Sequence, residues 1–98
     1  MDIEYELRGI LFRWDAEKEQ TNIAKHEGIN FRQAAQVFFD PFLMCEDASR
    51  NDEARDGAIG VDFDFKVLYV IHILFESDYI RIISAKKAEP WQRKLYED

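Results

Sequence analysis

The sequence predicts an α+β fold, in which two N-terminal helices and a C-terminal helix pack on one antiparallel sheet of four or five strands. Two neighbouring runs of β-branched and aromatic residues, Val67–Phe75 and Tyr79–Ala85, have the composition of paired strands. Two helical patterns lie between residues 15 and 40, and Pro90 suits the first position of a last helix. The 98 residues are predicted to form one domain, residues 1–98, because no repeat or linker divides them.

The run Val67–Phe75 is the predicted central strand, because its single non-apolar residue is His72 and both of its faces could be buried. The turn residues Glu76, Ser77 and Asp78 would join it to Tyr79–Ala85 as an antiparallel hairpin. Strand alternation then predicts two faces for the second strand, with Ile80, Ile82 and Ser84 on one and Tyr79, Arg81, Ile83 and Ala85 on the other.

The N-terminal part should contain one short strand and two helices. Residues Ile3–Phe12 suggest a first strand that is interrupted near Gly9. Asp15 and Asn30 suit the N-caps of the two helices, and Gly28 would close the first of them. The second helix has an apolar face formed by Phe31, Ala34, Ala35 and Phe38.

Two further strands and a loop are expected before the central strand. Phe42–Cys45 suggests one strand, and residues 46–57 have the composition of a long exposed loop. Ala58–Val61 should pair with the central strand through a turn at Asp62, Phe63 and Asp64. In the last helix, Trp91 and Leu95 stand at i and i+4 and are expected to pack on the sheet.

Charge and cysteine content limit the possible classes of function. Thirteen Lys and Arg against twenty Asp and Glu give a net charge of −7, which argues against broad, nonspecific attraction to nucleic acid. The acids concentrate in residues 40–64 and the bases in residues 81–94. The single Cys45 excludes an internal disulfide framework, no apolar run approaches a membrane span, and the acidic N-terminus is unlike a signal peptide. A cytoplasmic protein is therefore expected.

Several chemical sites are disfavoured, and we expect no metal and no cofactor. The acids of residues 46–57 lack the spacing and the final Glu of a calcium loop. His26 and His72 lie too far apart to suggest a local zinc site. A nucleophilic pair of Cys45 and a histidine stays possible, although a lone cysteine in an apolar strand is more often a core residue.

The remaining constellation consists of cations, one histidine and one acid: Lys25, His26, Glu53, Arg55, Arg81, Lys86 and Lys87. Such a set suits cleavage of a phosphodiester through the ribose 2′-hydroxyl, which needs a base, an acid and fixed cations on the phosphorane oxygens. We expect Arg81, Lys86 and Lys87 to converge with Lys25 and His26 on one concave edge of the sheet. The alternative is a chance arrangement, because scattered Lys and Arg occur on every soluble protein.

Three stretches resemble the BrnT toxins of type II toxin-antitoxin systems: WDAEKEQTNIAKHEGINFRQAAQVFFDP, DEARDGAIG and RIISAKKAEPWQRKLYE. The resemblance covers nearly the whole chain. The matching site positions are Lys25, His26, Glu53, Arg55 and Arg81, with Lys87, Arg93 and Tyr96 at the end of the pattern.

The resemblance implies a RelE-like α+β fold and a ribonuclease that blocks translation, with Lys25, His26, Glu53, Arg55 and Arg81 as catalytic residues and Lys86, Lys87, Arg93 and Tyr96 as substrate-binding residues. It also implies a BrnA-like ribbon-helix-helix antitoxin, through which operator DNA would be bound indirectly. The chain departs from the family at Lys86, where the family commonly has arginine. Together with the net charge of −7, this leaves open a second hypothesis, a binding module that has lost catalysis and acts only in a repressor complex.

Overall fold

The computed structural model describes residues 1–76 and 78–98, so Ser77, which we had placed in a turn, lies outside the described residues. The elements in chain order are β1 (Asp2–Leu7), β2 (Ile10–Asp15), α1 (Ala16–Lys25), α2 (Phe31–Ala35), the 3-10 helix η1 (Gln36–Phe39), β3 (Met44–Asp47), β4 (Asp56–Val61), β5 (Val67–Phe75), β6 (Tyr79–Lys87) and α3 (Pro90–Glu97). No helix among these is both long and apolar enough to cross a membrane.

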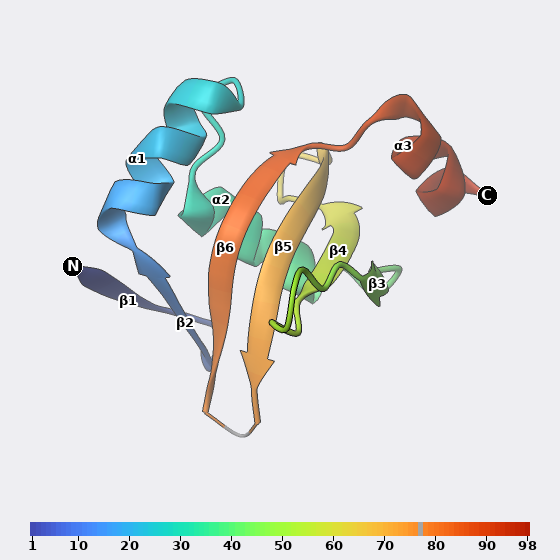
Figure 1. Cartoon of the computed structure of the whole chain (residues 1–98). Coiled ribbons are helices and arrows are strands. Elements are labelled where there is room, and N and C mark those ends of the chain that lie inside the picture. The colour runs from blue at the N-terminus through green and yellow to red at the C-terminus, as the bar shows by residue number, and fades with distance from the viewer. Residues whose placement is uncertain (77) are drawn as a thin grey trace.

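The six strands form one sheet in the order β1-β2-β6-β5-β4-β3. The α+β prediction is confirmed, but the sheet has more strands than the four or five expected, and it is mixed, because β2 and β6 run parallel. In Figure 1, α2 lies behind the sheet, while α1 and α3 stand at its two sides. Among the described residues, no helix therefore covers the front face of the sheet between α1 and α3 in this view.

The N-terminal segment is a hairpin, not a single interrupted strand. β1 and β2 pair antiparallel with Leu7 opposite Ile10, so that the loop is only Arg8 and Gly9. Both residues have positive φ, 51° and 86°, as a two-residue type I′ turn requires. The prediction was wrong because arginine is not a usual residue at the first of these positions.

Both predicted N-caps are present. The carboxylate of Asp15 accepts a hydrogen bond from the backbone N–H of Lys18 (3.1 Å), and the amide oxygen of Asn30 accepts one from Gln33 (2.7 Å). The two short helices therefore begin at Ala16 and Phe31, as these caps indicated.

The core lies between the back of the sheet and the α2–η1 segment. The largest fully buried side chains are Trp14, Phe12, Phe31, Ile59, Leu68, Ile82, Val37 and Val70. β5 has the predicted bounds, but only alternate residues such as Leu68 and Val70 are buried, and Leu74 is 61% exposed. The expectation that both faces of β5 are buried is therefore wrong.

A β-bulge in β6 changes the predicted faces of that strand. His72 pairs with Ile82 but Ile71 pairs with Ser84, so β6 carries an extra residue, Ile83. As a result both Ile82 and Ala85 reach the core, with 1% exposure each. Simple alternation had put Ser84 with Ile82 and Ala85 on the opposite face, which the bulge reverses.

The β3 edge and α3 also differ from expectation. Cys45 is exposed on the edge strand rather than buried. Trp91 and Leu95 are 56% and 47% exposed. The helix is held instead by Gln92, which is buried, and by Tyr96, whose hydroxyl donates to Asp40 Oδ2.

We expect the stability of the fold to fall as the pH drops below about 6.5, the ordinary pKa of histidine. Burial lowers the pKa of His72. This effect is larger than the opposite effects of the hydrogen bond to the Val70 carbonyl and of the negative charge of Asp56, both of which raise the pKa. Because the unfolded chain then binds a proton more readily than the folded chain, the free energy of unfolding should decrease by up to about 1.4 kcal/mol per pH unit. Urea unfolding between about pH 7.5 and 5 measures this slope, and His72→Leu should flatten it. An equal slope in the variant would contradict the assignment to His72.

Candidate active site

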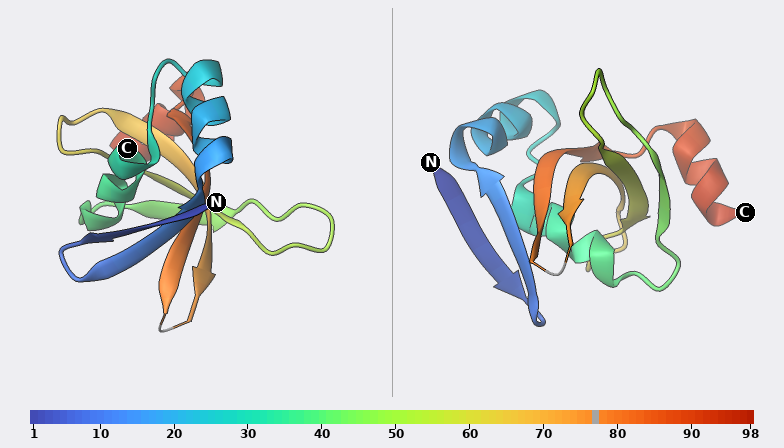
Figure 2. Two further views of the ribbon diagram at one scale, coloured as in Figure 1. Left: turned by 90° about the vertical axis from the view of Figure 1, so that its left-hand side faces the viewer. Right: turned by 60° about the horizontal axis from the view of Figure 1, so that its bottom comes forward.

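A groove crosses the front of the sheet between the C-terminal end of α1 and the arm formed by residues 48–55. The arm connects β3 to β4 and projects from the sheet on the side opposite α2 (Figure 2). Two adjoining hollows of about 510 and 410 Å³ make up the groove, and His26, Arg55 and Ser84 line both. The first is also lined by Lys25, and the second by Arg50 and Lys86.

Asn22 attaches α1 to β6 and so places Lys25 and His26 at the groove. Its amide Nδ2 donates to the carbonyl of Ala85 (2.7 Å), and its Oδ1 accepts from the N–H of the same residue (3.0 Å). A third bond runs from Nδ2 to the carbonyl of Ile29 (3.1 Å). Asn22 is buried, so these bonds fix the end of α1 against the strand.

The β-bulge supplies the groove with the side chains of β6. Because Ala85 turns into the core after the bulge, Ser84 and Lys86 on either side of it face the groove. Lys86 lies within the strand, not after it as expected, and its Nζ is 3.2 Å from Glu89 Oε1. A rigid strand therefore presents both the hydroxyl and the ammonium group.

The arm supplies Arg55 and Arg50 from the other side. The N–H of Ala48 donates to the carbonyl of Arg55 (2.9 Å), which closes the base of the arm. Glu53 pairs with Nε of Arg55, so the guanidinium is oriented by a carboxylate. Arg55 has 25% of its side chain exposed, against 53% for Glu53, so Arg55 is the more enclosed member of the pair.

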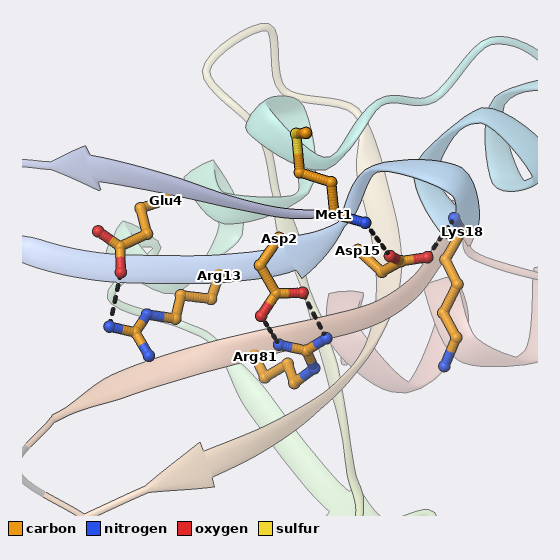
Figure 3. A network of polar contacts seen from close by, with 7 residues as sticks. All are labelled: Met1, Asp2, Glu4, Arg13, Asp15, Lys18 and Arg81. Carbon is orange, nitrogen blue, oxygen red and sulfur yellow. Dashed lines mark hydrogen bonds and ion pairs between the residues drawn. The ribbon is translucent and has the colours of Figure 1, made fainter.

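Arg81 stays outside the groove. It leaves β6 on the front face, two residues before Ile83, but its guanidinium binds the carboxylate of Asp2 with two hydrogen bonds of 3.0 Å (Figure 3). The hydrogen bond to Asp2 raises the pKa of Arg81, and the same bond lowers the pKa of Asp2. The expected convergence of Arg81 with Lys25 and His26 is therefore incomplete.

Lys87 lies beside the groove, and two other predicted binding residues lie elsewhere. Lys87 is exposed at the end of β6 and lines a third hollow together with Lys25, His26 and Lys86, where Glu27 and Glu89 are also present. Arg93 and Tyr96 belong to α3, which stands at the opposite side of the sheet from α1 in Figure 1. Arg93 pairs with Glu97 (3.7 Å), and Tyr96 binds Asp40, which also accepts from Val61 N (2.9 Å). In this structure Tyr96 holds α3 to β4.

The sequence analysis missed Arg50, Tyr69 and Ser84 as groove residues. Tyr69 had been assigned to a strand whose two faces could both be buried, and Ser84 to the same face of its strand as Ile80 and Ile82. The alternation of side chains along β5, with a tyrosine at position 69, indicated that the Tyr69 side chain is partly exposed. No local sequence pattern indicated the bulge in β6.

The groove can bind an anion and move a proton. Among the described residues no ion pair involves Lys25 or Arg50, so neither has a carboxylate within 4.0 Å. His26 adds an imidazole, the group that most often transfers protons near neutral pH. Asp15 and Glu17 also line the larger hollow. The described residues contain no group of three or more His, Cys, Asp or Glu placed to hold a metal ion.

Residues 14–91 match the family model described as the ribonuclease toxin BrnT of type II toxin-antitoxin systems. The chain belongs to this family. It is similar to the ribonuclease toxin BrnT of Brucella abortus, known from a crystal structure at 1.1 Å, with 28% sequence identity and a TM-score of 0.57 over 78% of this chain and 92% of that one. No curated protein matches the chain.

Membership of the BrnT family implies a ribonuclease toxin with an antitoxin partner. The matched range begins inside β2, so β1, which carries the partner of Arg81, lies outside it. The groove residues from Lys25 to Lys86 all lie within the match.

Proposed function

We propose that this BrnT-family chain cleaves RNA without a metal ion, by attack of the ribose 2′-hydroxyl on the adjacent phosphate. The single observation that carries the proposal is the meeting of His26 and Arg55 in one groove, from α1 and from the arm, with Lys25 and Lys86 beside them. A proton-transfer group and fixed cations around one space are what this reaction needs.

Each group has a role in the proposal. His26 takes the proton of the 2′-hydroxyl as this oxygen attacks phosphorus, and the imidazolium gives the proton to the 5′ oxygen as the bond from phosphorus to that oxygen breaks. Arg55 and Lys25 stabilise the charge that develops on the phosphorane oxygens, and Lys86 binds a neighbouring phosphate. Glu53 orients Arg55 through their ion pair. The point charge of Lys86 can replace the arginine common in the family for phosphate binding, although not for a two-pronged contact.

The partner in this proposal is a BrnA-like ribbon-helix-helix antitoxin. The concentration of acids in residues 40–64 supports an association with a basic segment, because complementary charges guide two proteins together. Inhibition of translation would follow from RNA cleavage, and operator DNA would be bound through the antitoxin alone.

One observation favours the alternative of a binding module without catalysis. Arg55, Lys86 and Arg81 each pair with a carboxylate of the chain itself: Glu53, Glu89 and Asp2. RNA must displace or share these partners to use the cations. In the alternative, RNA does not displace these carboxylates, and the chain serves only in the repressor complex.

Incubation of the purified chain, freed of its antitoxin, with single-stranded RNA and EDTA separates the two functions. We expect cleavage, with fragments that end in a 2′,3′-cyclic phosphate and begin with a 5′-hydroxyl, because a 2′-oxygen nucleophile gives these products first. End analysis by mass spectrometry identifies them. Products with 5′-phosphate ends would contradict the mechanism, and intact RNA with a folded chain would favour the binding module.

A further inference from the structure

The smaller hollow of the groove has an aromatic floor that the proposed cleavage chemistry does not use. Tyr69 and Ile71 of β5 form this floor, and Arg50, Arg55 and Lys86 stand around it. Its volume of about 410 Å³ lies within the usual range of small-ligand pockets, roughly 300 to 1,000 Å³. A polar ligand with one flat apolar part would fit these surroundings.

The ring of Tyr69 is fixed flat against the sheet. One side of it rests on Gly57 of β4, since a Cβ atom at that glycine would lie 2.6 Å from the ring atoms Cε1 and Cζ. The hydroxyl donates to Glu46 Oε1 (3.0 Å), which ties the ring to β3. Burial, followed by this hydrogen bond, raises the pKa of Tyr69 to about 12, so the phenol stays a donor. With one face on the sheet and the edge tied down, the other face is presented to the hollow.

Cations surround this ring in the pattern that binds unpaired nucleotides. Lys86 lies in β6 directly opposite Tyr69, and its Nζ is over the ring, 5.9 Å from the centroid. Arg50 and Arg55 approach from the arm. Proteins that bind single-stranded nucleic acid combine positive charges along the backbone with aromatic rings on which bases stack. An apolar peptide side chain would gain from the ring but not from the three cations.

We propose that this hollow binds one unpaired base of the RNA, stacked on Tyr69, next to the phosphate that is cleaved. The phosphate would lie where the two hollows join, at His26 and Arg55. The inference rests on the proposed ribonuclease function and adds to it the substrate class, a single strand with an accessible base beside the cleavage position.

The test uses a short single-stranded oligonucleotide whose cleavage position, mapped first with the wild-type chain, carries a 2′-deoxyribose and cannot be cut. Binding is measured by fluorescence anisotropy for this RNA and for two versions that lack the base on either side of that position. For the wild type, loss of one of the two bases should weaken binding roughly 5- to 150-fold, because base-aromatic stacking contributes about 1 to 3 kcal/mol. Tyr69→Leu should abolish this difference, whereas Tyr69→Phe should keep it.

Phe42→Leu is the matched control, because Phe42 is an aromatic residue 74% exposed outside the groove, and it should behave as the wild type. If Tyr69→Leu loses as much affinity as the wild type when the base is removed from the RNA, the inference is wrong, even if the wild type cleaves RNA fully. So would a Tyr69→Leu variant that binds every RNA normally but binds the antitoxin weakly, which would assign the hollow to the protein partner. A wild-type chain that neither binds nor cuts RNA would instead refute the proposed function itself.

Discussion

Replacement of Arg55 with alanine is expected to slow RNA cleavage by roughly 10²- to 10³-fold, as for the loss of one fixed donor to the transition state. The fold should survive, because the Arg55 backbone carries the contacts at the base of the arm: its carbonyl accepts from Ala48 N and its N–H donates to Ser49 Oγ. A partly exposed ion pair such as Arg55–Glu53 contributes only about 0 to 1 kcal/mol to stability. Single-turnover cleavage rates and thermal melting of the same preparation measure both effects.

Arg32→Ala is the matched control for Arg55→Ala. Arg32 is an exposed arginine of α2, on the opposite side of the sheet, where it stacks over Tyr5 at 5.1 Å from the ring centroid. Its loss should leave the cleavage rate within about twofold of the wild type. Arg55→Lys should recover only part of the lost rate, because lysine keeps the charge but not the planar fork. A folded Arg55→Ala variant with the wild-type rate would remove Arg55 from the proposed site.

Asn22→Ala is expected to lower the free energy of unfolding by about 3 to 5 kcal/mol, a large share of the stability of a domain this size. The substitution leaves three buried backbone groups without their partner: the N–H and carbonyl of Ala85 and the carbonyl of Ile29. Each buried group without a partner costs about 1 to 3 kcal/mol. Urea denaturation gives the value directly.

Asn30→Ala provides the comparison for Asn22→Ala, because it removes an exposed asparagine that caps α2 with a single bond. Its expected cost is about 1 kcal/mol. If both variants unfold with the same loss of stability, the attachment of α1 to β6 does not depend on Asn22.

Local sequence signals were sufficient for several elements. The bounds of β5, the caps of α1 and α2, and the turn before β5 were predicted because each depends on neighbouring residues. Asp62 illustrates this, since its carboxylate accepts from the N–H groups of Asp64 and Lys66 (both 2.9 Å) within the same turn. Lys86 and Lys87 were expected to converge with Lys25 and His26, and these four residues do line one hollow.

The remaining features depend on contacts between distant segments. Arg81 was expected at the site, but its partner Asp2 lies 79 residues away, and Tyr96 is separated from Asp40 by 56 residues. The parallel pairing of β2 with β6 and the bulge at Ile83 also arise only in the assembled sheet. No periodicity within one segment contains this information, so the face of Ser84 and the role of Tyr96 could not be predicted.

The position of β6 between β2 and β5 determines when the groove can form during synthesis. β2 ends at Asp15, but the strand that pairs with its second edge consists of residues 79–87, so this edge stays unpaired until β3, β4, β5 and β6 have been translated. The chain between β2 and β6 forms a long loop, and closing this loop costs conformational entropy before the contacts between the two strands compensate for it. This cost slows folding. A nascent chain that lacks β6 has neither Ser84 nor Lys86 nor the anchor for α1. The groove is therefore absent from a nascent chain until residues 79–87 have been translated.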